Sequence, residues 1–387
     1  MLSSVVSYMA EPEKIIVYTC PYVPAEWIAA HGLTPRRLIP LPVAGAVTIP
    51  RMEGLCPYAR AFVNDVAACE NVDGVIITTL CDQMRRVFDL LVRRARLPAF
   101  LLNVPSTWQT VAAQRLYLDE LKRLSRFLVR LGGRAPDRDE LARAMLDPDL
   151  PGESGSEFRL QAGVRSTAFT RVKPSDLPSS LPRLRNVEPA APEDSLARLK
   201  AELGPQTRTK AFGDPLRTHE TNRTATGRPS TRLGRTESHG VGVPIAVVGG
   251  PLMQRDQVLF DIIRDCGGQI VLDATETGAR GRHGPFDRRR LADDPLLELA
   301  QTYFRIPDAG RRPNSELYEW LQEELHRSGA RGILFHHYVW CDKWRAELAR
   351  LKEWVGLAVL GLDSDGNGEM SLARLRSRVR AFLEMLE

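Results

Sequence analysis

The feature of this sequence that most restricts its fold is an alternation of short apolar runs with amphipathic stretches, which occurs in two separate sets. The first set begins near residue 14 with KIIVYTC, and the second begins at Pro244 with PIAVVGG. Short β-branched runs separated by helical stretches are typical of βαβ units, whose strands pair in parallel. We therefore predict an α/β fold with two Rossmann-like parallel-sheet domains.

The segment between the two sets differs in composition. It is rich in Pro, Arg, Ser and Thr, and almost no apolar periodicity follows Leu203. Such a segment buries too little apolar surface to offset the entropy cost of ordering the chain. We predict a flexible linker or insertion at 150–243, most disordered at 207–240, between an N-terminal domain at 1–149 and a C-terminal domain at 244–387. A segment that folds on a partner is the alternative.

Composition and charge exclude several classes of protein. The net charge is only +5 over 387 residues, and no run of Lys and Arg interleaved with aromatic residues points to nucleic acid. No apolar stretch approaches the roughly 20 residues of a membrane helix. The N-terminal stretch MLSSVVSYMAEPEK lacks the pattern of a secretory signal. We therefore expect a cytoplasmic protein that binds neither nucleic acid nor membrane.

Two of the six cysteines occupy matching positions. VIITTLCDQMRR around Cys81 and GILFHHYVWCDKWR around Cys341 are both apolar runs that end in Cys-Asp and continue as helix-like segments. In a parallel sheet, ligands gather at the carboxyl ends of the strands, where loops lead into helices. A thiolate just ahead of a helix is favoured by the helix dipole, which suits metal binding or nucleophilic chemistry. In an open sheet of this kind, both cysteines are candidates for a shared site.

The remaining cysteines differ in position. Cys56 precedes a Pro at a predicted helix start, and Cys20 ends a predicted strand. Cys69 and Cys266 are predicted to lie inside amphipathic helices, where packing is the ordinary role. The absence of a close C-x-x-C pair argues against structural zinc and ferredoxin-type motifs. Spacing alone leaves two alternatives open, which are shared metal ligation and buried small side chains without a function.

Four further residues lie near these segments. His336 and His337 end the strand ahead of Cys341, and neighbouring strand residues face opposite sides, so at most one can face a cleft as a proton donor. Arg280 and Arg282 are candidates for contacts with phosphate groups, although exposed loop arginines are common. No G-x-x-x-x-G-K-[ST] motif occurs in the sequence, so the chain is not predicted to be an ATPase.

Taken together, these segments resemble the D-component subunits of the 2-hydroxyacyl-CoA dehydratase and benzoyl-CoA reductase family. The resemblance extends over nearly the whole chain outside the linker. The matching pieces are YTCPYVPAEWIAAHGLTPRRL, GLCPYARA, VIITTLCDQMRR, YLDELKRL, DATETGARGR, FHHYVWCDKW and SRVRAFLEMLE. Two departures are the long Arg- and Pro-rich insertion and the bulky HHYVW ahead of Cys341, where smaller residues are expected.

The resemblance implies two Rossmann-like domains with one [4Fe-4S] cluster between them. By motif, its ligands are Cys56, Cys81 and Cys341, which leave one iron open, while Cys20 matches a position that is not a ligand. The implied enzyme is a lyase or oxidoreductase that uses a low-potential electron for radical dehydration or reduction of a CoA thioester.

The implied partners are a paralogous second subunit, or a second copy of the chain, and an ATP-dependent iron-sulfur activator. One alternative is a non-catalytic subunit that bears a cluster for electron transfer or acts as a scaffold. Another is a metal-free α/β binding protein that keeps only the fold; the presence of all three motif cysteines argues against it.

Overall fold

The computed structural model describes residues 13–42, 52, 54–69, 71–95, 97–148, 150, 242–365 and 369–387. Met1–Ala162 and His239–Glu387 form one compact unit, and both sheets belong to it. The second unit, Gly163–Ser238, lies outside the described residues, as does nearly all of the predicted linker. The domain boundaries at 149 and 243 therefore stay a prediction.

The N-terminal part of the chain forms a four-stranded parallel sheet in the order β2-β1-β3-β4. Its strands are β1 (Ile15–Tyr18), β2 (Thr34–Arg37), β3 (Gly74–Thr78) and β4 (Ala99–Leu102). Its helices are α1 (Ala25–Ala30), α2 (Pro57–Ala68), α3 (Asp82–Leu90), α4 (Val111–Arg130) and α5 (Arg138–Met145), with a π-helical turn at Leu91–Ala95. Alternate strand residues bury opposite faces, because Ile76 packs with α4 while Val75 and Ile77 pack with α2.

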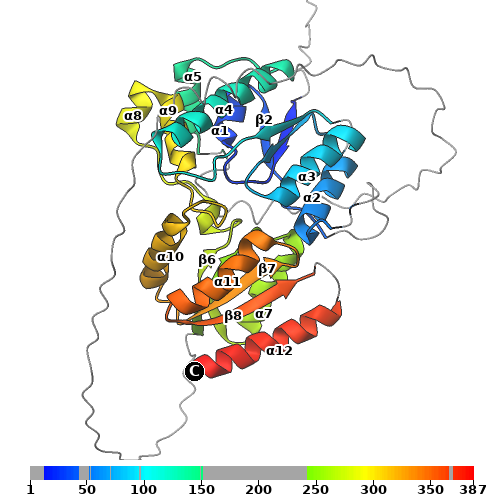
Figure 1. Cartoon of the computed structure of the whole chain (residues 1–387), viewed down its shortest axis with the longest axis vertical. Coiled ribbons are helices and arrows are strands. Elements are labelled where there is room, and N and C mark those ends of the chain that lie inside the picture. The colour runs from blue at the N-terminus through cyan, green and yellow to red at the C-terminus, as the bar shows by residue number, and fades with distance from the viewer. Residues whose placement is uncertain are drawn as a thin grey trace, which may run out of the picture. The chain divides into compact units, whose positions relative to one another are not determined.

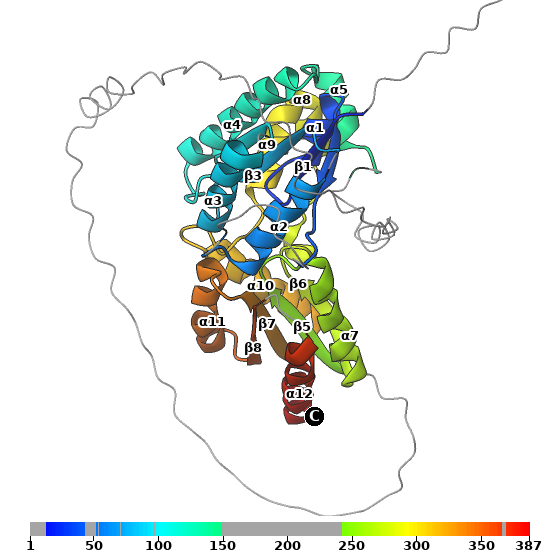
Figure 2. The same ribbon diagram turned by 90° about the vertical axis from the view of Figure 1, so that its right-hand side faces the viewer.

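The C-terminal part forms a second parallel sheet in the order β6-β5-β7-β8. Its strands are β5 (Val243–Gly249), β6 (Gly268–Ala274), β7 (Gly332–Tyr338) and β8 (Ala358–Ser364). Its helices are α7 (Val258–Asp265), α8 (Arg288–Asp293), α9 (Pro295–Phe304), α10 (Ser315–Ser328), α11 (Asp342–Trp354) and α12 (Glu369–Leu386), with short 3₁₀ turns η5 (Gln254–Gln257) and η6 (Ala279–Gly281). Helices α10 and α11 cover one face and α7 and α12 the other (Figure 2).

Both sheets thus have the same order of strands along the chain, and the predicted α/β fold with two parallel sheets is confirmed. Strand β3 in the first sheet corresponds to β7 in the second, and each lies beside the first strand of its own sheet. The two Cys-Asp dipeptides follow these two strands. The matching sequence positions of Cys81 and Cys341 therefore correspond to matching positions in the fold.

Helices α8 and α9 follow β6 in the chain, but α9 packs against the first sheet's helices α4 and α5, and α8 packs against α9 (Figure 1). Leu299 and Phe304 of α9 are buried in the same hydrophobic cluster as Tyr117 and Leu121 of α4. The Tyr117 and Phe304 rings stack with centroids 5.3 Å apart. The hydrophobic core around the first sheet is therefore completed by residues from the second half of the sequence.

Backbone carbonyls of the first half accept several hydrogen bonds from the second half. Arg311 Nη1 donates to Pro105 O at 2.8 Å, and the Arg312 N–H donates to Ser106 O at 2.8 Å. On another edge, Gln254 Nε2 donates to Ile39 O at 2.8 Å. These bonds join the two sheets within one unit and keep the carboxyl ends of β3 and β7 close together.

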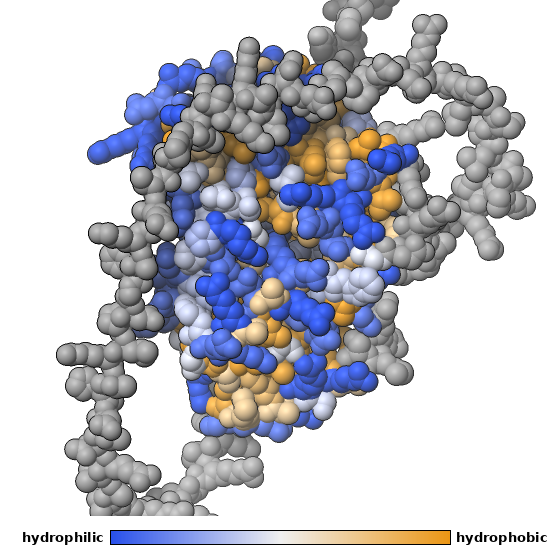
Figure 3. All heavy atoms as spheres, in the orientation of Figure 1, coloured by the Kyte–Doolittle hydropathy of each residue, from blue (hydrophilic) through white to orange (hydrophobic). Residues whose placement is uncertain are grey.

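The surface of the described residues contains both hydrophilic and hydrophobic side chains. In Figure 3, hydrophilic and hydrophobic residues alternate over the visible face, as expected for a chain that is 43% hydrophobic and 26% charged. Among the helices of the described residues, none is long and apolar enough to cross a membrane. The cytoplasmic location stays a prediction.

Candidate functional site

Each of the three predicted cysteines immediately precedes a helix. Cys56, Cys81 and Cys341 are the N-cap residues of α2, α3 and α11. Cys56 is buried in a hydrophobic cluster against which both other cysteines pack, and the three thiols are close enough to influence one another electrostatically. The structure therefore gathers three residues that are far apart in the sequence.

Backbone N–H groups at the starts of the three helices act on the thiols, and at Cys56 one of them forms a hydrogen bond. The Ala59 N–H donates to Cys56 Sγ at 3.4 Å. Backbone N–H groups of Gln83 and Met84 lower the pKa of the Cys81 thiol, and that of Trp344 lowers the pKa of the Cys341 thiol. The first N–H groups of a helix have no partner within it. Cys56 satisfies one of these donors, whereas Cys81 and Cys341 accept no capping hydrogen bond and are influenced only by the field of the helix start.

Burial has the opposite effect on the pKa of the three thiols to that of the N–H groups, and the effect of burial is larger. It raises the pKa of the Cys56 thiol to about 12 and that of the Cys341 thiol to about 11, and it also raises the pKa of Cys81. All three groups are therefore neutral thiols at pH 7 when no metal is bound. A metal that binds here must displace the protons, because only the thiolate is a strong ligand.

A group of four charged residues, three of them buried and Lys343 largely so, lies next to the thiols. Lys343 Nζ is 3.1 Å from both carboxylate oxygens of Asp308 and 3.7 Å from Glu276 Oε2. Arg280 pairs with the same two carboxylates at 3.2 and 3.6 Å. Lys343 also lowers the pKa of Cys81 and Cys341, so its ammonium lies within electrostatic reach of both.

Arg280, a candidate for contacts with phosphate groups, is not the exposed loop arginine that was the alternative. Its side chain is fully buried, pairs with Glu276 and Asp308, and lies over the Trp344 ring at 4.6 Å. Sequence reasoning did not find the other three charged residues, because they come from three separate segments. The only local sign was Lys343, which lies two residues after Cys341.

Helix α3 holds the loop that carries Cys56. Gln83 Oε1 accepts a hydrogen bond from the Cys56 N–H at 3.0 Å, and Arg86 Nη1 donates to Gly54 O at 3.1 Å. Gly54 has a φ of +76°, which favours glycine. Trp340, next to Cys341, also has a positive φ of 70° and is 58% exposed beside Gly54. The bulky residue ahead of Cys341 thus lies on the surface next to the Cys56 loop.

The other cysteines lie apart from this group. Cys20 packs against a different hydrophobic cluster, where burial raises its pKa to about 12, although Glu276 and Lys343 still influence its thiol. Cys69 and Cys266 were predicted inside helices, and this is wrong, because they are the C-cap residues of α2 and α7. Cys266 packs against a hydrophobic cluster, while Cys69 is exposed.

Both histidines of β7 are buried, and they line different pockets. His337 lines a pocket of about 860 Å³ that also includes Gln83 and Trp340. His336 lines a pocket of about 350 Å³ with Asp256, and burial lowers its pKa. The two histidine side chains therefore lie on opposite faces of the strand, as expected for neighbouring strand residues. Only the His337 pocket includes residues that neighbour Cys81 and Cys341.

Two tyrosines beside the thiols were not found from the sequence. The Tyr338 hydroxyl donates to Asp256 and accepts from the Met253 N–H at 2.8 Å. The Tyr58 hydroxyl bonds Thr19, and the Tyr58 and Tyr338 rings lie 6.0 Å apart in the hydrophobic cluster that contains Cys56. Both residues lie within three positions of a candidate cysteine, which is the sequence signal that was overlooked.

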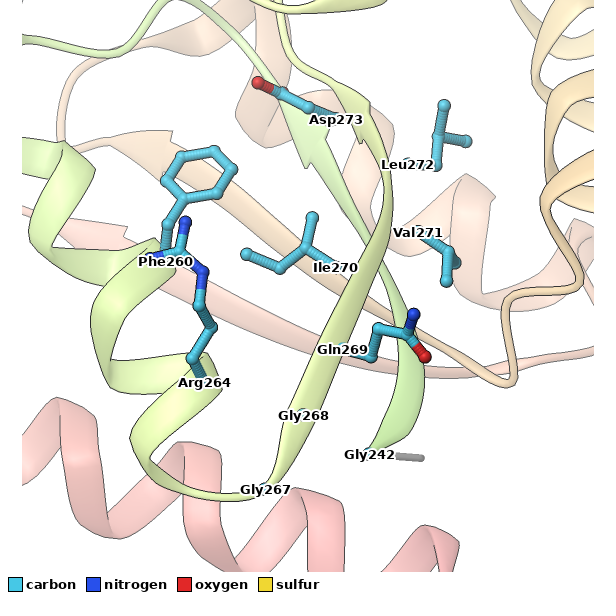
Figure 4. A pocket seen from close by; sticks show the side chains of 10 residues that line it. All are labelled: Gly242, Phe260, Arg264, Gly267, Gly268, Gln269, Ile270, Val271, Leu272 and Asp273. Carbon is cyan, nitrogen blue, oxygen red and sulfur yellow. The ribbon is translucent and has the colours of Figure 1, made fainter. Parts of the chain in front are cut away.

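A third pocket, of about 570 Å³, lies along β6 (Figure 4). Gly242, Gly267 and Gly268 line it at the amino ends of β5 and β6, whereas the thiols follow the carboxyl ends of strands. Ligands of parallel sheets bind at the carboxyl ends. We therefore do not assign this pocket to the site.

Within the described residues, no three His, Cys, Asp or Glu side chains converge closely enough to hold a single metal ion. An iron-sulfur cluster makes a different demand, because each cysteine binds its own iron and the sulfur atoms need not meet at one point. The donor set of one buried and two partly buried thiols, each at the start of a helix, fits such a group.

Comparison with known proteins identifies one family. Residues 20–147 and 219–386 match the family model described as 2-hydroxyglutaryl-CoA dehydratase, D-component. These two ranges cover more than half of the chain and include all three candidate cysteines. No curated protein matches the chain at a significant level.

Proposed function

Because the chain belongs to the 2-hydroxyglutaryl-CoA dehydratase D-component family, we propose that it is the iron-sulfur subunit of an enzyme that dehydrates or reduces a CoA thioester. Family membership makes it a dehydratase-type component of a multi-subunit system. The finer proposal is that Cys56, Cys81 and Cys341 hold a [4Fe-4S] cluster, with a paralogous subunit or a second copy and an ATP-dependent activator as partners.

The observation that carries this proposal is the convergence of three thiols on three helix N-termini in one buried cluster. Soft thiolate ligands are those that iron-sulfur clusters use in proteins. Three cysteines on four irons would leave one iron open to a further ligand. Such an open position is what a substrate oxygen requires.

When bound, such a cluster would supply one electron at a low potential, which no side chain can provide. The protein contributes the surroundings. Met84, Tyr58 and Tyr338 belong to the apolar cluster that buries Cys56 and against which Cys81 and Cys341 pack. The N–H groups at the starts of α2, α3 and α11 and the Lys343 ammonium compensate the negative charge of the thiolates.

Iron and acid-labile sulfide content of the full chain, purified without oxygen, tests the proposal. We expect about four irons per chain and an EPR signal after reduction. Each of Cys56→Ala, Cys81→Ala and Cys341→Ala is expected to lose most of the iron, while the matched control Cys69→Ala keeps it.

Two results would count against the ligand set. Absence of iron from the wild-type protein under these conditions would contradict the cluster itself. Loss of iron from Cys20→Ala, to the same extent as from the three variants, would contradict the choice of three ligands.

The reaction is tested separately, with a paralogous subunit and an activator present. Conversion of a 2-hydroxyacyl-CoA to an enoyl-CoA and water would support dehydration. Reduction of an aromatic CoA thioester would support the reductase alternative. Full cluster content with neither reaction would favour the non-catalytic role in electron transfer.

A further inference from the structure

The Lys343 side chain occupies a constrained position between two of the three thiol-bearing loops. It lies two residues after Cys341, and its side chain is 15% exposed. A Cβ atom placed on Gly310 would lie 3.3 Å from both Lys343 Cδ and Leu80 O, so the lysine stem and the residue that precedes Cys81 both lie next to Gly310. The ammonium group is therefore held near Cys81 as well as Cys341.

The four buried charges have a distinct arrangement. Asp308 is shared between Lys343 and Arg280, at 3.1 and 3.2 Å. Glu276 is paired more loosely, at 3.6 Å from Arg280 and 3.7 Å from Lys343. Lys343 lowers the pKa of both the Cys81 and the Cys341 thiols and Glu276 raises it, so the two charges act on these thiols with opposite signs, although burial has the largest effect.

We propose that the Lys343 ammonium and the Glu276 carboxylate set the reduction potential of the metal centre held by Cys56, Cys81 and Cys341, a role that rests on the proposed function. One-electron reduction by an external reductant adds one negative charge to the centre, and no bond forms or breaks. A nearby positive charge stabilises the reduced form, and a nearby negative charge destabilises it. Because Glu276 is buried and the Lys343 side chain is only 15% exposed, water and salt screen them less than surface charges.

Two substitutions with opposite expected effects test this role. Lys343→Met removes the positive charge at similar volume and is expected to shift the midpoint potential to more negative values. Glu276→Gln removes the negative charge at equal size and is expected to shift it to less negative values. The double variant is expected to lie between the two. The measurement is an EPR-monitored redox titration of the full chain, with iron content determined on each sample.

Lys352→Met is the matched control, because Lys352 is an exposed lysine on the same helix, α11. Its potential is expected to equal that of the wild type. If Lys343→Met fails to retain iron, the Glu276→Gln variant alone tests the proposal. A shift of its midpoint potential to less negative values supports the proposal, and any other result contradicts it.

Iron retained at wild-type content with no shift, or with shifts of the same sign in both single variants, would overturn this inference and leave the proposed function intact. A wild-type protein without iron would refute the proposed function itself, and this inference with it.

Discussion

Comparing the substitution of Gly54 by alanine with the same substitution at Gly329 distinguishes the cost of backbone strain from an effect on the loop that carries Cys56. Gly54 has a φ of +76°, and an added Cβ would lie 3.3 Å from Arg86 Nη1, the atom that bonds the Gly54 carbonyl. Gly329, at the end of α10, has a similar φ of +65°, and a Cβ there would meet no atom within 4 Å. The two glycines share a conformation but differ in their surroundings.

The left-handed conformation costs a non-glycine residue about 1–2 kcal/mol, which is a factor of roughly 5 to 30 in the ratio of folded to unfolded protein. We expect both Gly54→Ala and Gly329→Ala to lose this amount in denaturant unfolding. The contact with Arg86 adds little to the free energy, because the end of a flexible side chain can move. That movement, however, breaks the hydrogen bond that holds the Cys56 loop.

Only Gly54→Ala is therefore expected to lose iron faster than the wild type during incubation with a chelator. The assay follows iron release over time in both variants and in the wild type, in native buffer. Equal rates of release from Gly54→Ala and Gly329→Ala would refute the reasoning that Arg86 and Gly54 hold the Cys56 loop.

Two further predictions concern stability. Leu299→Ala, at a fully buried position of α9, is expected to destabilise the protein by about 2–5 kcal/mol, whereas Leu297→Ala, 39% exposed on the same helix, changes stability by about 0.5 kcal/mol or less. Equal denaturation midpoints would contradict the packing of α9 on α4. Burial raises the pKa of Glu316 from 4.5 to about 7, so the folded state binds more protons than the unfolded state in that window, and stability falls as pH rises from about 4.5 to 7. Glu316→Gln is expected to remove part of this fall, and parallel stability curves against pH for the variant and the wild type would contradict it.

Local sequence pattern predicted the elements and the positions of three candidate cysteines in the fold. The β-branched runs around Ile76 and Phe335 form parallel strands, and a cysteine after such a run lies at the carboxyl edge of the sheet. Cys56 ahead of Pro57 is the N-cap of α2, as the Pro at the first helical position indicated. These features depend on neighbouring residues alone, so one sequence is enough to read them.

The errors arise where a residue's surroundings come from distant segments. Arg280 was considered as a phosphate contact or an ordinary exposed loop arginine, yet its side chain is fully buried, pairs with Asp308 and lies over the Trp344 ring. Cys69 and Cys266 were placed inside helices, and each is instead the residue at which a helix ends. Helix ends are the least certain part of a sequence-based assignment, since the last turn has few constraints of its own.

The sequence by itself determined that the chain forms two parallel sheets and that strands and helices alternate in the same way in both halves. It also determined that Cys56, Cys81 and Cys341 lie at helix starts. Those properties follow from periodicity and capping, which are local. Only the tertiary structure decided that α8 and α9 complete the core of the first sheet and that Glu276, Asp308 and Lys343 gather beside the thiols. Burial and ion pairing join segments far apart in the chain, and no local pattern encodes which distant partners will meet.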